Sequence, residues 1–152
     1  MLDRFDQKIL IVLQEDATIS LASLSERIGL SQTPCWKRVR RLENDGYIVG
    51  RVTLLDREKL GLGVTVFVSI KTSRHDEAWL REFAERVAAF PEVVEFYRMS
   101  GDTDYLLKVV CSDIGDYDRI YRKLIRSAQL FDVSSSFAME QIKYTTLLPL
   151  PQ

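Results

Sequence analysis

A run of basic side chains lies close behind a short turn in the first third of the chain. Between Arg27 and Leu42 the sequence holds five basic residues and no acidic one, although the formal net charge of all 152 residues is only -1. Gly29-Leu30 separates two short helical patterns, and Ser31 stands where the second pattern begins. Proteins use a short cationic helix behind a tight turn to present side chains to the major groove of DNA. The pattern therefore predicts a DNA-binding helix-turn-helix.

The candidate DNA contacts fall on two parts of the second helix, which we expect to run from about Gln32 to Asn44. Its N-terminus offers backbone N–H groups and the helix dipole, which favour a phosphate. Its outward face lies opposite Cys35, Val39 and Leu42, at spacings of three and four. The predicted set is Ser31, Gln32, Thr33, Lys37, Arg38, Arg40 and Arg41. An arginine in this set can hold guanine or phosphate, and the alternative is a solvated basic face.

A second group of polar residues surrounds Gly101, in the sequence Ser100-Gly101-Asp102-Thr103-Asp104. A pocket for a free amino acid needs an acid or carbonyls for the ammonium, and N–H groups or hydroxyls for the carboxylate. This turn offers both, and glycine lets the backbone come close to a ligand. The alternative is that the two aspartates only form an Asx-type hairpin turn.

The residues give little support for catalysis. The one histidine, His75, stands next to Asp76 in a predicted loop, where a surface or helix-capping role is expected. No nucleophile motif, phosphate-binding loop or dinucleotide fingerprint occurs. Cys35 and Cys111 fall in separate elements, which argues against a zinc site and favours reduced thiols. We therefore expect a protein that is not an enzyme and that needs no metal or cofactor.

The elements that position the basic residues follow from helical periodicity. A first helix is expected after a capping Asp3, and a second between a capping Ser20 and a terminating Gly29. Residues 47–54 indicate a short two-stranded wing behind the third helix. Trp36 can pack against this wing or lie along DNA, and packing is the interpretation that we favour.

The pattern changes to period two after residue 60, which predicts an N-terminal DNA-binding domain over 1–60 and a second domain over 61–152. The second domain is expected to alternate strands and helices in the order strand–helix–strand, twice. This order predicts a ferredoxin-like split β-α-β sandwich. The expected strands cover residues 64–71, 93–99, 104–111 and 133–144, and the expected helices lie around residues 79–87 and 114–125.

Three motifs together resemble the Lrp/AsnC family of leucine-responsive and asparagine-responsive (feast/famine) regulators. They are SQTPCWKRVRRLENDG, SGDTDYLLKV and SSFAMEQIKYTTLLPL, and the resemblance runs from Leu2 to Pro149. It implies an α+β chain with an N-terminal winged helix-turn-helix domain and a ferredoxin-like βαββαβ ligand-sensing domain. It also implies a homodimer that assembles to an octamer. The effector pocket implied by the family lies at the Gly101 turn and the final strand of an adjacent subunit, which adds Ser134, Ser135 and Ser136.

We therefore predict a sequence-specific regulator of transcription that binds double-stranded DNA, with DNA binding or assembly modulated by a free amino acid. Two alternatives are a ferredoxin-like enzyme with a fused helical domain and an amino-acid-binding module that regulates a protein partner. No apolar run is long enough for a bilayer, and Met1-Leu2-Asp3 lacks the features of a signal peptide. We expect a cytoplasmic, nucleoid-associated protein that does not bind membranes.

Overall fold

The computed structural model describes residues 1–73, 76–127 and 132–151, and it divides into two compact units. The N-terminal unit comprises Met1–Leu54 together with Lys143–Gln152, and the C-terminal unit comprises Leu55–Ile142. The sequence led us to place one boundary after residue 60. The observed division lies a few residues earlier, and the end of the chain returns to the N-terminal unit.

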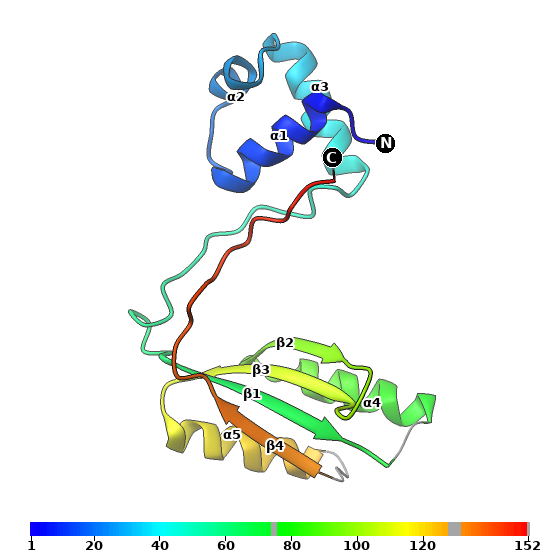
Figure 1. Ribbon diagram of the computed structural model, residues 1–152, viewed down its shortest axis with the longest axis vertical. Coiled ribbons are helices and arrows are strands. Elements are labelled where there is room, and N and C mark those ends of the chain that lie inside the picture. The colour runs from blue at the N-terminus through cyan, green and yellow to red at the C-terminus, as the bar shows by residue number, and fades with distance from the viewer. Residues whose placement is uncertain (74–75, 128–131, 152) are drawn as a thin grey trace. The chain divides into compact units, whose positions relative to one another are not determined.

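Three helices form the N-terminal unit: α1 (Arg4–Glu15), α2 (Leu21–Ile28) and α3 (Gln32–Asn44) (Figure 1). The side chain of Asp3 accepts hydrogen bonds from backbone N–H groups of the first turn of α1, and Ser20 does the same for α2. Gly29 ends α2 in the left-handed region at φ 78°, which favours glycine. The predicted caps Asp3 and Ser20, the stop at Gly29 and the predicted limits of α3 are confirmed, whereas Ser31, which we expected to cap α3, makes no side-chain capping bond.

The core of the N-terminal unit lies between these helices. Its buried side chains are Ile9, Leu10, Val12, Leu24, Ile28, Cys35 and Leu42. Val39 of the predicted inward stripe is partly buried against this cluster, as are Ile48 and Leu150. Leu150, near the C-terminus, therefore helps to close the core of the N-terminal unit.

The predicted wing is not formed as a strand pair, because residues 47–54 contain no strand. The N–H groups of Tyr47 and Ile48 bind the carbonyl of Leu42 at the end of α3. Beyond them, Val49, Val52 and Leu54 are exposed, with no neighbouring strand recorded for them in the described residues. The segment therefore lacks the backbone hydrogen bonds between strands that a wing requires.

The C-terminal unit is a four-stranded antiparallel sheet with two helices (Figure 1). The strand order β2-β3-β1-β4 is that of a ferredoxin-like sandwich, and it confirms the predicted α+β fold class. The elements are β1 (Val64–Lys71), α4 (Glu77–Ala88), β2 (Val93–Arg98), β3 (Tyr105–Cys111), α5 (Ile114–Ser127) and β4 (Asp132–Phe137).

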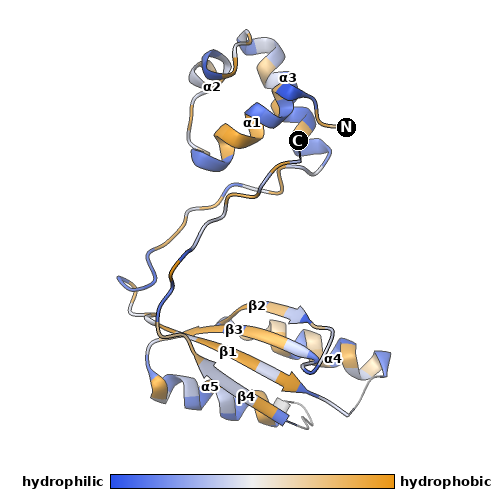
Figure 2. Ribbon diagram, viewed as in Figure 1, coloured by the Kyte–Doolittle hydropathy of each residue, from blue (hydrophilic) through white to orange (hydrophobic). Residues whose placement is uncertain are grey.

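Both helices pack on the same face of the sheet. Alternate residues of β1 and β3, the two most apolar strands in Figure 2, are buried beneath α4 and α5. Phe83 of α4 is central to this core, because its ring stacks on Trp79 at 5.0 Å and meets the rings of Phe96 and Tyr105. No described helix packs on the opposite face of the sheet.

The final strand is shorter than predicted. We expected it to continue to residue 144, but β4 ends at Phe137. One more backbone bond, from the N–H of Ala138 to the carbonyl of Thr65, continues the contact with β1. Met139, Ile142 and Tyr144 of the expected extension are exposed, and residues from Lys143 onward belong to the N-terminal unit.

Candidate DNA interface and ligand-binding turn

The N-terminus of α3 is open to a ligand. Ser31 has the extended backbone of an N-cap, but its side chain makes no capping hydrogen bond. An N-cap hydroxyl normally accepts from the N–H of the second or third helical residue. The third residue here is Pro34, which has no N–H. The Ser31 hydroxyl and the first N–H groups of α3 are therefore available to bind an acceptor or anion outside the chain.

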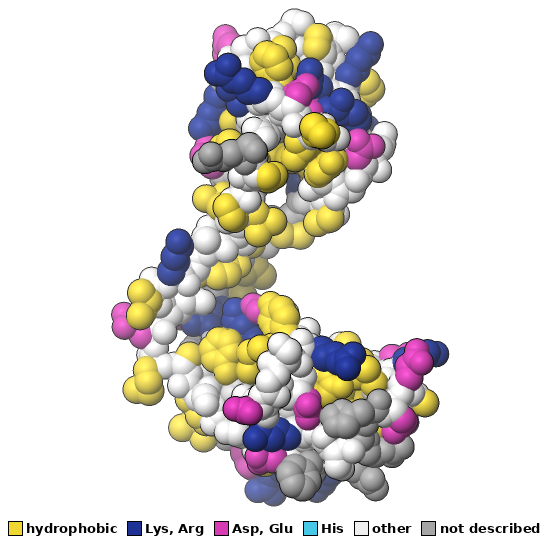
Figure 3. All heavy atoms as spheres, turned by 45° about the vertical axis from the view of Figure 1, so that its right-hand side comes forward, with side chains coloured by type: hydrophobic (Ala, Val, Ile, Leu, Met, Phe, Trp, Pro, Cys, Tyr) yellow, Lys and Arg dark blue, Asp and Glu magenta, His cyan; other side chains and the backbone are white. Residues whose placement is uncertain are grey.

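The outward face of α3 carries Thr33, Lys37 and Arg40, all exposed. Lys37 is the one cation of α3 for which the described residues provide no ion pair. The space-filling view shows several lysine and arginine side chains on the visible surface of the N-terminal unit (Figure 3). The helix thus presents a hydroxyl, an ammonium and a guanidinium in one row.

Arg38 and Arg41 point toward α1 instead. Arg38 donates to Asp3 at 2.5 Å and to Asp6 at 2.8 Å, and Arg41 donates to Asp6 at 2.5 Å. Asp6 is fully buried, so its charge requires these partners. The Asp6 backbone N–H and then the Arg38 guanidinium lower the pKa of Asp3 to about 2. We did not predict this contact between α1 and α3 from the sequence.

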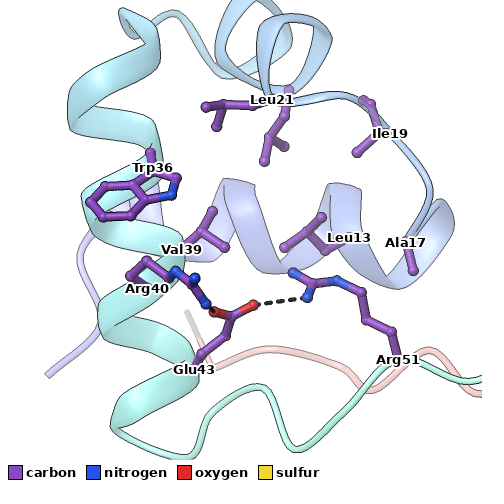
Figure 4. Close-up of a pocket in the computed structure, with 10 residues that line it drawn as sticks. Leu13, Ala17, Ile19, Leu21, Trp36, Val39, Arg40, Glu43 and Arg51 are labelled. Atoms are coloured by element: carbon purple, nitrogen blue, oxygen red, sulfur yellow. Dashed lines mark hydrogen bonds and ion pairs between the residues drawn. The ribbon is translucent and has the colours of Figure 1, made fainter.

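Arg40 lies between an aromatic ring and an acid. Its guanidinium lies over the ring of Trp36 at 5.7 Å and donates to Glu43 at 3.1 Å, while Arg51 donates to the other oxygen of Glu43 at 2.8 Å (Figure 4). Arg51 and then Arg40 lower the pKa of Glu43. The Trp36 side chain is half exposed, so part of it contacts the protein and part of it faces solvent.

These residues border a hollow between the three helices of the N-terminal unit (Figure 4). Its apolar wall includes Leu13, Ile19, Leu21 and Val39, and the Arg40–Glu43–Arg51 group closes one side. Arg51 was absent from our predicted set. Its position within the expected wing at 47–54, and its positive charge, were the signals that could have included it.

The positive charge of the sequence motif is largely balanced in three dimensions. Four of the five basic residues between Arg27 and Leu42 form ion pairs with acids outside that stretch. Three of those acids, Asp3, Asp6 and Glu15, lie on α1 or cap it, and Glu43 follows directly after the stretch. The acid-free motif therefore overstates how much positive charge α3 presents to solvent.

The predicted ligand turn joins β2 to β3. The N–H of Met99 binds the carbonyl of Asp104 at 2.8 Å and closes the hairpin around Gly101. Gly101 has φ 111°, which side chains rarely tolerate, and no described atom lies within 4 Å of where its Cβ would stand. The turn therefore needs glycine for its backbone conformation, and the space beside Gly101 is free.

The two aspartates of the turn have different surroundings. One carboxylate oxygen of Asp104 accepts the N–H of Thr72 at 2.8 Å, and the N–H of Asp104 binds the carbonyl of Ile70. Asp104 thus ties the end of β1 to the start of β3. Asp102 is exposed, with no partner among the residues of known placement. Ser100 is exposed as well, and Thr103 is partly buried.

The three predicted serines lie on both faces of β4, because neighbouring strand residues alternate. The Ser135 hydroxyl forms a hydrogen bond with the Tyr117 hydroxyl of α5, on the helix-covered face. Ser134 and Ser136 face the other side, opposite Ser69 and Phe67 of β1. The turn and β4 are not neighbours within the sheet, because β3 and β1 separate β2 from β4.

Other kinds of site find no support in the described part of the chain. It contains no group of three or more His, Cys, Asp or Glu residues that could hold a metal ion. His75, for which we expected a surface or helix-capping role, lies outside the described residues, and its neighbour Asp76 caps α4. Both cysteines are free and buried, and burial raises the pKa of each thiol. None of the helices described is long and apolar enough to cross a bilayer.

Two family models match the chain in order. Residues 2–49 match a winged helix-turn-helix DNA-binding model, and residues 65–148 match the Lrp/AsnC ligand binding domain. The first match contains α3 with its turn, and the second contains the Gly101 turn and β4.

Relatives and solved structures are similar over nearly the whole length. The DNA-binding transcriptional activator DecR of Escherichia coli is 53% identical over 151 residues, which are 99% of this chain and 99% of the relative. An AsnC family transcriptional regulator from Agrobacterium tumefaciens is 58% identical, with a TM-score of 0.95 over 97% of both chains. A transcriptional regulator of Neisseria meningitidis, solved in complex with L-Met, is 35% identical, with a TM-score of 0.92 over 98% of this chain and 97% of its own.

Proposed function

The chain belongs to the Lrp/AsnC family of transcriptional regulators, and from this premise we propose a separate role for each of its two units. It is a DNA-binding regulator with an amino-acid-binding domain, and not an enzyme. We propose that α3 reads a DNA sequence and that the Gly101 turn holds the ammonium or carboxylate of a free amino acid. The observation that carries the proposal is the exposed row of Thr33, Lys37 and Arg40 behind the Gly29 turn.

On the DNA side, we propose two kinds of contact. The open N-terminus of α3 at Ser31 and Gln32 suits a phosphate, because N–H groups and the helix dipole favour an anion there. Thr33, Lys37 and Arg40 suit base edges or phosphates in the major groove. From our predicted set, Arg38 and Arg41 take a different role, because their guanidinium groups bind the acids of α1.

On the ligand side, we propose that Asp102 binds the ammonium of a free amino acid. Its carboxylate is exposed beside the open space at Gly101, whereas one oxygen of the Asp104 carboxylate is held by Thr72. The complex of the Neisseria meningitidis regulator with L-Met supports an amino acid as the ligand class. By family resemblance, Ser134 and Ser136 of an adjacent subunit complete the pocket.

We further propose that the chain forms a homodimer that assembles to an octamer. Paired half-sites in DNA suit a two-fold dimer. The sheet face without a described helix exposes part of Phe67 and carries Leu106 and Val110, which a second copy can cover. The chromosomal target implies a cytoplasmic, nucleoid-associated protein. Light scattering at micromolar concentration tests the assembly, and a monomer there contradicts it.

A thermal-shift screen of the purified chain against the twenty amino acids tests the ligand class. A ligand that binds only the folded state raises the unfolding temperature by mass action. We expect one amino acid, or a few similar ones, to raise it and to change the affinity for a DNA duplex selected in vitro with this chain. If no amino acid has either effect, the proposed effector is wrong.

A further inference from the structure

We propose that Asp6 determines DNA specificity from outside the DNA-reading face, as a built-in counter-ion that withholds Arg41 from phosphates and fixes the rotation of α3. This inference rests on the proposed DNA-reading face of α3. It adds a residue of α1 to the determinants of recognition.

The Asp6 carboxylate uses both of its oxygens. Oδ1 accepts from Arg38 at 2.8 Å, and Oδ2 accepts from Arg41 at 2.5 Å and from the backbone N–H of Asp3 at 3.0 Å. The Asp6 side chain is 1% exposed, although its arginine partners reach toward solvent. Within the described chain no buried side-chain polar atom lacks a hydrogen bond, so this charge is fully satisfied.

The two arginines restrict how α3 can turn about its axis. They stand three residues apart, so they lie on one side of the helix and converge on a single carboxylate. Lys37 and Arg40 each precede one of them, and one residue turns a helix by roughly 100°. Because of this fixed offset, the ion pairs that hold Arg38 and Arg41 against α1 also set the direction of Lys37 and Arg40.

Arg38 and Arg41 differ in how firmly they are held. Arg38 has a second acid, Asp3, and its guanidinium lies over the ring of Phe5. Asp6 is the one ion-pair partner of Arg41 in the described structure, and the Arg41 side chain is 49% exposed. Loss of the Asp6 charge would therefore free Arg41, while Arg38 would stay paired with Asp3.

A freed Arg41 would bind phosphate without reading sequence. Phosphate contacts act on any DNA, and each makes the slope of log affinity against log salt concentration more negative by about 0.9. Asp6 prevents that contact in the native chain. We infer that its charge keeps non-specific affinity low and so widens the gap between operator and other DNA.

The test compares the parent chain, Asp6→Asn, and the double variant Asp6→Asn with Arg41→Gln. Their affinity for a short duplex of random sequence is measured by fluorescence anisotropy over a range of salt concentrations. We expect Asp6→Asn to steepen the salt slope by about one per DNA-bound α3 and to tighten binding several-fold at low salt. We expect the double variant to return to the parental slope. For Asp6→Asn, the ratio of the affinity for a duplex selected in vitro with the parent chain to the affinity for random DNA should fall several-fold.

Two results overturn the inference. One is an unchanged salt slope in Asp6→Asn, even if the variant melts at a lower temperature, because Asp6 would then be only structural. The other is a lower slope in Arg41→Gln alone, because Arg41 would already contact phosphate; this variant decides the matter if Asp6→Asn does not fold. Lys37→Ala separates the two proposals: if both its salt slope and its affinity for the selected duplex are parental, Lys37 does not contact DNA and the DNA-reading face is wrong, whatever Asp6 does.

Discussion

The side-chain amide of Gln14 on α1 forms two hydrogen bonds with the backbone of Leu148. Its Oε1 accepts the Leu148 N–H at 2.6 Å, and its Nε2 donates to the Leu148 carbonyl at 3.3 Å. Gln7 donates to the carbonyl of Pro151 at 2.8 Å in the same way, and Leu150 packs on the core of the N-terminal unit. The end of the chain is thus a structural part of the unit that reads DNA.

The first prediction concerns Gln14→Ala. The change removes both bonds to Leu148, and we expect it to lower the free energy of unfolding of the N-terminal unit by about 1 kcal/mol, because exposed hydrogen bonds contribute little each. Urea unfolding followed by Trp36 fluorescence, with Trp79→Phe in parent and variant alike, measures it. Gln141→Ala, in the C-terminal unit, is the matched control. Equal stability of Gln14→Ala and the control would contradict a role for the end of the chain.

The second prediction concerns Lys37 and Arg40. Replacing either residue with Ala should weaken binding to a duplex selected in vitro, by roughly 1–3 kcal/mol for a lost base contact. A lost phosphate contact should instead lower the salt slope by about one. Both side chains are exposed, so the fold should survive. Lys123→Ala on α5 controls for loss of a lysine elsewhere. If the double variant keeps the parental affinity and slope, these residues do not face DNA.

Local signals in the sequence predicted the helices of the N-terminal unit well. Asp3, Ser20 and Gly29 act on their immediate neighbours, so their roles as caps and stops could be inferred without tertiary structure. The contact of Asp6 with Arg41 could not, because 35 residues separate them and either charge alone suggests a solvated surface. The same holds for the return of Leu150 to the N-terminal core.

The candidate ligand site was predicted in composition but not in detail. The Gly101 turn between two strands was predicted from the sequence, and its φ of 111° accounts for the glycine there. The different surroundings of Asp102 and Asp104 depend on Thr72, 32 residues from Asp104, and no local pattern indicates that bond. The strand alternation could have separated Ser135 from Ser134 and Ser136, since adjacent residues face opposite sides.

The third prediction concerns acid and the cap of α1. The N–H of Asp6 and the Arg38 guanidinium lower the pKa of Asp3 from 3.8 to about 2. Between about pH 4 and pH 2 the folded chain therefore binds fewer protons at Asp3 than the unfolded chain does, so stability falls as pH falls. Asp3→Asn keeps a good helix cap but cannot titrate. Thermal unfolding at pH 4, 3 and 2 should show a shallower loss in this variant, and parallel curves would contradict the role of Asp3.

The last prediction separates the two aspartates of the Gly101 turn. Asp104→Asn keeps an oxygen that can accept the Thr72 N–H but loses the charge, so it should lower the unfolding temperature and weaken the bond between β1 and β3. Asp102→Asn should leave the unfolding temperature nearly unchanged, because Asp102 is exposed. It should weaken binding of the amino acid found by the thermal-shift screen, because an ammonium at a subunit contact needs a negative partner. Coupling between the ligand and DNA is reciprocal, so the factor by which the ligand changes DNA affinity must equal the factor by which DNA changes ligand affinity, in parent and variant.

Calorimetry with the ligand, with and without DNA, measures the ligand affinity and the effect of DNA on it. If Asp102→Asn and Asp104→Asn both bind the ligand as tightly as the parent, the turn is only a hairpin and the sensing site lies elsewhere in the C-terminal unit.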